Sequence, residues 1–137
     1  MTRRKQRELA FSLLFEKNFD MERDVNEIYS TAIEIRDEEP DEFVNQTVNG
    51  VFLHYDEIMQ IIEKNSQGWK LNRISRVSLS IMQLAIYEML FTDIPLKVSI
   101  NEAIELSKLY DDDKARAFIN GILNAVAKGI DGKKIDE

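Results

Sequence analysis

Hydrophobic residues recur at helical spacing in the first forty residues of the chain. Leu9, Leu13 and Leu14 are spaced by four and one, and together with Ala10 and Phe15 they predict an amphipathic helix from about residue 3 to 18. A second hydrophobic set follows Asp24, which stands three residues before Glu27 as in a capping box. This pattern predicts a second helix that ends before Pro40, since the residue before a proline disfavours helical geometry.

The strongest helical signal follows Pro40. Apolar residues repeat there at alternating spacings of four and three: Val44, Val48, Val51, Tyr55, Ile58 and Ile62. Asp56 and Glu57 interrupt this run, so one long helix or two shorter ones are both open. From Arg73 to Phe91 apolar residues surround the helix axis, which predicts the central and most buried helix, ending before Pro95.

Two more helices complete the predicted fold. Ser99 and Glu102 have capping-box spacing, which predicts a helix from near Ile100 to about Tyr110. The last helix follows an acidic turn at residues 111–113 and frays after Gly129, and Gly121 within it predicts a close helix contact. We therefore expect residues 1–137 to form a single domain, an all-α compact bundle of about six or seven helices.

Composition removes several classes of protein. Of the 137 residues, 44% are hydrophobic and 31% are charged, and none is cysteine. Such a chain has neither a disulfide scaffold nor cysteine-ligated metal, and no apolar run approaches the ~20 residues of a membrane span. We expect a cytoplasmic globular protein.

Charge is distributed unevenly. The formal net charge is −7, yet Arg3, Arg4, Lys5 and Arg7 stand against Glu8 alone in residues 3–8, for a net +3. Residues 20–42 carry ten acidic side chains against two arginines, for −8. Because salt screens charge beyond ~8 Å, the basic segment could bind an anion locally, or it could be a solvated helix start.

Candidate catalytic groups are few. His54 is interpreted as a surface or boundary residue, because Asp56, two positions on, would point to another helix face. Glu88, within the apolar helix, must be paired or neutral, and an interhelical ion pair is favoured over a catalytic acid. Trp69 is interpreted as filling the core. We expect no enzymatic activity, no metal site and no cofactor.

Three stretches carry a resemblance to a known family. They are TRRKQRELAFSLLF at the start, LAIYEML followed by DIPLKVSINEAIELSKLY, and FINGILNAV near the end. In this order they closely resemble the NusB family of bacterial transcription antitermination factors. The resemblance implies two three-helix subbundles plus a short helix. It also implies pairing with the small-subunit ribosomal protein NusE, binding of single-stranded boxA RNA, and read-through by RNA polymerase, notably in ribosomal RNA operons.

The resemblance also implies site residues. RNA contacts would fall on the basic start and on the beginning of the last helix, and partner contacts on the first and central helices. The RNA set is Arg3, Arg4, Lys5, Arg7, Lys114, Arg116 and Phe118, and the partner set is Phe15 and Ser78. Phe118 could stack on a base or pack in the core. This chain departs from common family residues at Ser78, Gln83, Asp111 and Ala115.

Other functions compatible with the sequence are a helical protein-interaction scaffold and a fragment corresponding to the RNA-binding domain of a ribosomal RNA cytosine methyltransferase. The latter enzyme's glycine-rich motif and catalytic cysteine do not occur in these 137 residues. A homodimer that covers the RNA site is also open.

Overall fold

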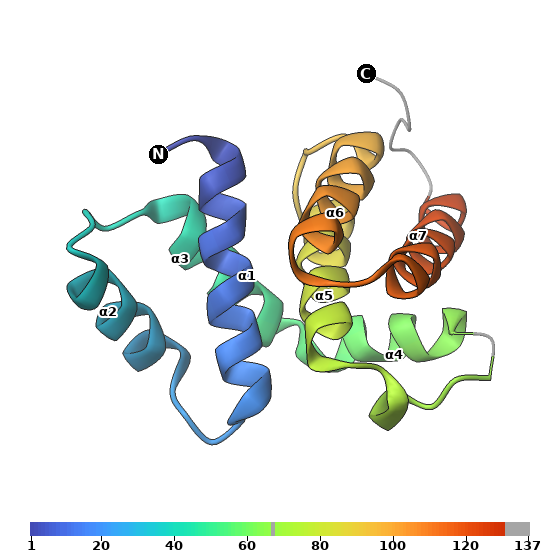
Figure 1. The fold of residues 1–137 in the computed structure, drawn as a ribbon, viewed down its shortest axis with the longest axis horizontal. Coiled ribbons are helices and arrows are strands. Elements are labelled where there is room, and N and C mark those ends of the chain that lie inside the picture. Colours follow the sequence, from blue (N-terminus) through green and yellow to red (C-terminus); the bar gives the residue numbers. More distant parts are fainter. Residues whose placement is uncertain (67, 131–137) are drawn as a thin grey trace.

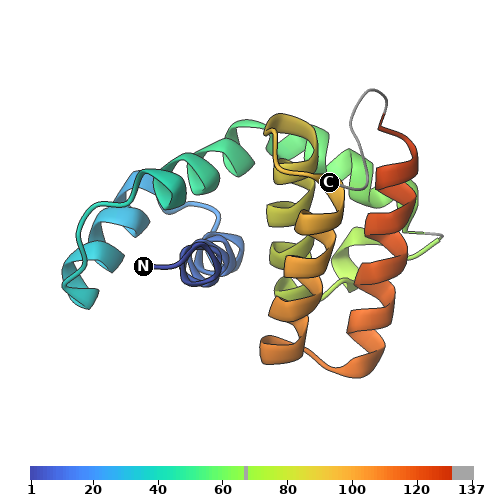
Figure 2. The same ribbon diagram turned by 90° about the horizontal axis from the view of Figure 1, so that it is seen from above.

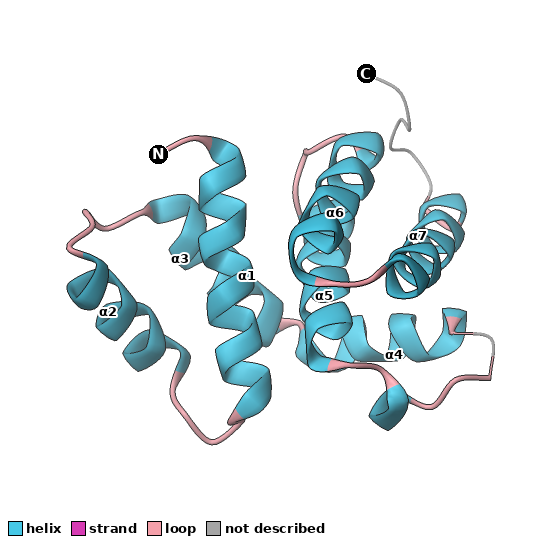
Figure 3. Ribbon diagram, in the orientation of Figure 1, coloured by secondary structure: helices cyan, strands magenta, loops and turns pink. Residues whose placement is uncertain are grey.

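The computed structural model describes residues 1–66 and 68–130, so residue 67 and residues 131–137 of the predicted domain lie outside the described part. Within it the chain forms seven α-helices and one 3-10 turn and no strand, which confirms the all-α prediction (Figure 3). The elements are α1 (Arg3–Phe19), α2 (Val25–Arg36), α3 (Glu42–Leu53), α4 (Tyr55–Asn65), η1 (Leu71–Arg73), α5 (Arg76–Phe91), α6 (Leu96–Tyr110) and α7 (Asp113–Lys128).

The helices form two groups that meet along α1 and α5. Helices α1, α2 and α3 make the amino-terminal group, and α5, α6 and α7 stand beside one another in the second group, with α4 across one end (Figure 1). Seen from above, α1 lies between its two partner helices and the second group (Figure 2). Helix α5 packs against α1, α3, α4, α6 and α7, so it joins the two groups.

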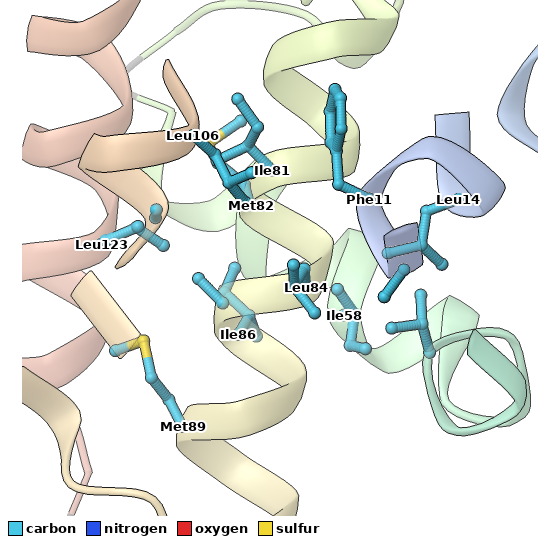
Figure 4. Packing of buried hydrophobic residues seen from close by; sticks show 14 of the residues in the cluster. Phe11, Leu14, Ile58, Ile81, Met82, Leu84, Ile86, Met89, Leu106 and Leu123 are labelled. Atoms are coloured by element: carbon cyan, nitrogen blue, oxygen red, sulfur yellow. The ribbon is translucent and has the colours of Figure 1, made fainter. Parts of the chain in front are cut away.

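One hydrophobic core runs through both groups. The α1 side chains Leu9, Leu13 and Leu14 are buried, as their spacing predicts. Figure 4 shows Phe11 and Leu14 of α1 on the same side of α5 as Leu84. Ten residues of α5 are buried, which confirms it as the central helix. Each fully buried large aliphatic side chain contributes about 1.5–3 kcal/mol relative to exposure, so α5 holds the two groups together.

The long run after Pro40 is broken into two helices. The break falls at His54, the one residue between α3 and α4, just before the acidic residues that suggested it. Asp56 and Glu57 lie in the first turn of α4, where the helix dipole favours negative charge. His54 is half-buried and its ring stacks on Phe91 with centroids 3.8 Å apart, which agrees with a boundary residue.

The predicted start of the sixth helix is wrong. Helix α6 begins at Leu96, four residues before Ile100, with Pro95 at the N-cap position. Proline fits there because the first backbone N–H groups of a helix have no intrahelical acceptor. Ser99 is buried inside the helix, and its hydroxyl donates to Glu88 Oε1 at 2.9 Å instead of capping.

Two packing predictions are also wrong. A Cβ added at Gly121 would meet nothing within 4 Å, so no other helix packs closely against this glycine. The close approach occurs at Gly50, where an added Cβ would lie 2.6 Å from the Tyr87 hydroxyl oxygen. Trp69 does not fill the core, since it is 54% exposed. It follows Gly68, whose φ of 91° is a backbone conformation that glycine adopts readily.

Candidate nucleic-acid interface

The first turn of α1 presents three exposed cationic side chains, Arg3, Arg4 and Lys5, which we call the basic arm. The helix begins there because Thr2 caps it, with its hydroxyl accepting from the Lys5 backbone N–H at 3.1 Å. The other first-turn amides point out of the helix end and carry a partial positive charge. Cations and amide donors at one helix start form a surface suited to phosphate.

Arg3 is held by an aromatic ring from α3. Its guanidinium carbon lies 3.9 Å above the centroid of the Phe43 ring, a cation–π contact. The contact fixes the side chain beside the end of α1 and leaves it exposed. A guanidinium held in a fixed plane can stack on a base or donate hydrogen bonds to a phosphate, and it loses little further side-chain entropy on binding.

Asp41 joins the three amino-terminal helices beneath the basic arm. Its carboxylate accepts from the Val44 N–H at 3.0 Å, which caps α3, and from Gln6 Nε2 of α1 at 2.8 Å. Its backbone N–H donates to the Tyr29 hydroxyl of α2 at 2.8 Å. Burial alone would raise the pKa of Asp41, but these hydrogen bonds and the charge of Arg3 together lower it.

Arg4 is bound to a carboxylate on α6. Its Nε and Nη2 atoms donate to the two oxygens of Glu102 at 3.1 and 2.8 Å. This hydrogen bond, together with the charge of Glu102, raises the pKa of Arg4. Lys5 lies 3.7 Å from Glu8 on its own helix. Two of the three exposed cations therefore form an ion pair with a carboxylate.

The structure places Arg7 in the interior, apart from the exposed cations with which the sequence grouped it. Arg7 is 6% exposed and Glu88 is 1% exposed. Arg7 Nε and Nη2 donate to the Glu88 carboxylate at 2.7 and 3.2 Å. This confirms the interpretation of Glu88 as one half of an interhelical ion pair. The pair fixes α1 to α5, and through Ser99 to α6, directly below the basic arm.

The second predicted RNA-contact set lies at the start of α7. Lys114 is exposed, whereas Arg116 is half-buried and its Nη1 donates to Asp113 at 2.9 Å. Phe118 packs partly against the core, and its ring meets the edge of Trp69 with centroids 6.0 Å apart. Phe118 thus has both a core contact and an exposed aromatic neighbour.

Sequence reasoning missed Trp69 and Arg73 as neighbours of this set. Both line a hollow of about 440 Å³ together with Lys114 and Phe118. The residues come from the loop before η1, from η1 and from α7, so only the tertiary fold brings them together. The glycine before Trp69 was the only local signal of an exposed loop.

The two predicted RNA-contact sets meet α5 near its opposite ends. Arg7 meets α5 at Glu88, whereas the turn before α7 meets it at Ser78, through Asp111. Ten residues separate these points, which is roughly 15 Å along a helix. Glu105 of α6 lies between the sets: its pKa is lowered by a hydrogen bond from Lys108 and, in smaller measure, by the charges of Arg4 and Arg116.

The two predicted partner residues differ in exposure. Phe15 is partly buried, with its ring centroid 6.4 Å from that of Phe11. Ser78 is 4% exposed, and its hydroxyl donates to Asp111 Oδ2 at 2.7 Å. The larger exposed apolar group on this side is Phe19, which is 68% exposed and lies under the Arg76 guanidinium at 5.2 Å.

Gln83, one of the departures from common family residues, belongs to a buried polar cluster. Asn18 Nδ2 donates to Gln83 Oε1 at 2.6 Å and to Ser80 Oγ at 3.0 Å, which joins the end of α1 to α5. The buried Gln83 amide therefore has hydrogen-bond partners, and it holds the end of α1 against α5.

Within residues 1–66 and 68–130, no group of three or more histidine, cysteine, aspartate or glutamate side chains is placed to hold a metal ion. In the same ranges, no helix is long and apolar enough to cross a membrane.

The fold and the basic arm define an all-helical protein of two subbundles with a cationic helix start. The chain matches the model of the NusB family over residues 4–128. It is 45% identical over 130 residues to the transcription antitermination protein NusB of Acetivibrio thermocellus, covering 93% of this chain and 90% of the relative. It is 42% identical over 132 residues to that of Bacillus subtilis, covering 96% and 98%.

Two solved structures have the same fold. T. maritima NusB superposes with a TM-score of 0.83 at 32% identity, covering 94% of this chain and 92% of that one. A structure of antitermination factors NusB and NusE in complex with dsRNA gives 0.82 at 26% identity, covering 95% and 100%. The chain belongs to the NusB family.

Proposed function

We propose that this protein is a non-enzymatic transcription antitermination factor that pairs with NusE and binds single-stranded boxA RNA. In this proposal the complex joins RNA polymerase in the cytoplasm and promotes read-through, notably in ribosomal RNA operons. The basic arm is the primary RNA contact, and the start of α7 is the second. The observation that carries the proposal is the exposure of Arg3, Arg4 and Lys5 around a helix start on an otherwise acidic molecule.

Arg7 takes a supporting role in this proposal. Its buried bond to Glu88 holds the first helical turn at a fixed position against α5, so the three exposed cations act from a rigid base. Preorganised cations lose less conformational entropy when they bind phosphates. The direct contacts of the arm are thus Arg3, Arg4 and Lys5.

Unpaired RNA suits the aromatic groups beside the cations. Phe43 lies against Arg3 in one contact set, and Trp69 and Phe118 lie near Lys114 in the other. Proteins recognise single strands by stacking bases on aromatic rings or guanidinium planes, with cations on the backbone. The points at which the two sets meet α5, Glu88 and Ser78, are roughly 15 Å apart along the helix, so one strand crossing this surface could reach both sets.

The NusE part of the proposal is supported by family membership and by the related structure that contains NusE and RNA. The partner surface on this chain would include Phe15, the exposed Phe19 and the start of α5 near Ser78. Because Ser78 is buried, we assign it to shaping this surface through its bond to Asp111. Similarity over nearly the full length of antitermination relatives favours this function over a methyltransferase fragment.

A filter-binding titration with boxA-like RNA, with and without NusE, tests the proposal. We expect weak binding alone and tighter binding with NusE. Arg3→Ala/Lys5→Ala should weaken binding, whereas Lys64→Ala/Lys128→Ala, which removes the same charge from two exposed sites outside both sets, should change it little. Equal effects of the two double variants would contradict the proposal. NusE binding without RNA binding would favour an interaction scaffold.

A homodimer is a further part of the proposal. If a second copy covers the basic arm, RNA must compete with dimerisation. Light scattering across protein concentration should then show a dimer fraction that falls when RNA is added. A dimer fraction that RNA leaves unchanged would contradict occlusion of the arm.

A further inference from the structure

Glu102 occupies the edge of the Arg4 guanidinium that could otherwise donate to a phosphate. Both carboxylate oxygens are used: Oε1 accepts from Nε at 3.1 Å and Oε2 from Nη2 at 2.8 Å. A phosphate also offers two oxygens to the two parallel N–H groups of a guanidinium. The same edge of Arg4 cannot make two such paired contacts at once, so Glu102 and a phosphate compete for it.

Charge around the arm is largely balanced. Arg4 and Arg7 face Glu102 and Glu88, with Arg7 Nη1 also 3.8 Å from Glu102 Oε1. Two cations and two carboxylates give a local sum near zero. The net +3 of residues 3–8 therefore overstates the field that an approaching phosphate meets, because the opposing charges come from α5 and α6.

The two members of the Arg4–Glu102 pair differ in exposure. The Arg4 side chain is 59% exposed, whereas that of Glu102 is 17% exposed and lies between two guanidinium groups. An exposed ion pair is weak because water and salt screen it. Arg4 can therefore leave Glu102 and turn toward an external anion, and the carboxylate stays close to Arg7.

We infer that Glu102 is an internal competitor that masks Arg4, so that RNA gains this contact only by displacing the Glu102 carboxylate. The inference rests on the proposed RNA-binding function and adds its regulation. A lone phosphate must replace the carboxylate one for one, which yields little net attraction. An RNA strand that already contacts Arg3 and Lys5 holds its next phosphate near Arg4 and displaces Glu102 more readily. The masking contact thereby selects strands over small anions.

Glu102→Gln tests the inference, with Glu105→Gln as the matched control. Both changes remove one negative charge from α6, three residues apart, but Glu105 is bonded to Lys108 and not to Arg4. With NusE and boxA-like RNA, Glu102→Gln should tighten binding by roughly two- to fivefold, the range of an exposed ion pair. Its log–log salt slope should steepen by at most about 0.7, because the displaced carboxylate of wild type takes up a cation while the phosphate releases one. Glu105→Gln should gain less affinity and keep the wild-type slope.

A thermodynamic cycle with Arg4→Gln separates masking from general charge. In the Arg4→Gln background, Glu102→Gln should give no further gain, because the masked group is absent. Thermal melting confirms folding of each variant. If Glu102→Gln melts early, Glu102→Asp replaces it: the shorter side chain keeps the charge but shortens the reach to Arg4, so a smaller gain in affinity is expected.

Three outcomes would overturn the inference: unchanged or weaker RNA binding by folded Glu102→Gln, equal gains in Glu102→Gln and Glu105→Gln, or a gain that persists with Arg4→Gln. Arg3→Ala/Lys5→Ala is run alongside. If this variant binds RNA as wild type does, the proposed function itself fails. If it binds more weakly while Glu102→Gln shows no gain, only the masking of Arg4 is refuted.

Discussion

The buried pair of Arg7 and Glu88 gives the sharpest stability prediction. Arg7→Met removes the guanidinium and leaves the Glu88 carboxylate, 1% exposed, without its bidentate donor. The Ser99 hydroxyl at 2.9 Å still donates to the carboxylate, but it cannot neutralise the charge. Breaking one side of a buried ion pair costs about 3–5 kcal/mol in the free energy of unfolding. This is a large share of the 5–15 kcal/mol typical of a domain.

Arg7→Met/Glu88→Leu should recover most of that loss. Both charges are then gone and apolar groups of similar length fill the space, a replacement that is often neutral or stabilising. The Ser99 hydroxyl can turn to a carbonyl of the preceding helical turn. We therefore expect the double variant to lie within about 2 kcal/mol of wild type, well above the single variant.

Urea unfolding followed by circular dichroism measures these differences. With a slope of about 2 kcal/mol per molar urea, Arg7→Met should lower the midpoint by roughly 1.5–2.5 M. The conservative Arg7→Lys keeps the charge but loses the bidentate geometry, so it should fall between the two. The reasoning is refuted if Arg7→Met costs less than about 1 kcal/mol, or if the double variant is no more stable than the single one.

Three further changes test the packing and the capping. Gly50→Ala should destabilise by about 1–3 kcal/mol in urea unfolding, because the added Cβ would displace the Tyr87 ring; a wild-type midpoint would contradict the close approach. Gly121→Ala should stabilise by up to about 1 kcal/mol, since the site is an exposed helix interior with open space, and any loss would show a contact there. Asp41→Asn should cost roughly 0.3–1 kcal/mol at neutral pH, because the amide can still cap Val44 but the negative charge at the start of α3 and beside Arg3 is lost. The pKa of Asp41 is lowered on folding, so the stability it adds is present above the unfolded value of about 4 and is lost as the pH falls through the lower folded value. The difference between wild type and Asp41→Asn should therefore shrink in unfolding curves taken below about pH 4, and a difference constant with pH would contradict the ionised cap.

The helices themselves could largely be predicted from the sequence, because hydrophobic spacing follows directly from which face is buried. The apolar positions of α1 and α5 identified both helices and the central place of α5. The start of α6 was missed because a Ser and a Glu three residues apart can also occur inside a helix. Here Ser99 lies within α6 and donates a hydrogen bond to Glu88 of α5.

The site was only partly predictable, because pairing between helices is a tertiary property. The charge run identified the basic arm but grouped Arg7 with it. Arg7 stands three and four residues before Ala10 and Phe11, on the buried face of α1, and this spacing was the available signal. Nothing near residue 4 in the sequence indicates Glu102, which reaches Arg4 from 98 residues away.

The salt dependence of RNA affinity tests the central claim most directly. The dissociation constant of the complex of this protein and NusE for boxA-like RNA is measured across salt concentrations, for wild type and for Arg3→Ala/Lys5→Ala. If the exposed cations of α1 hold the RNA backbone, the double variant should bind more weakly and its log–log slope should be shallower by about 1.4, or 0.7 for each lost phosphate contact. An unchanged affinity and slope in the folded variant would contradict the account.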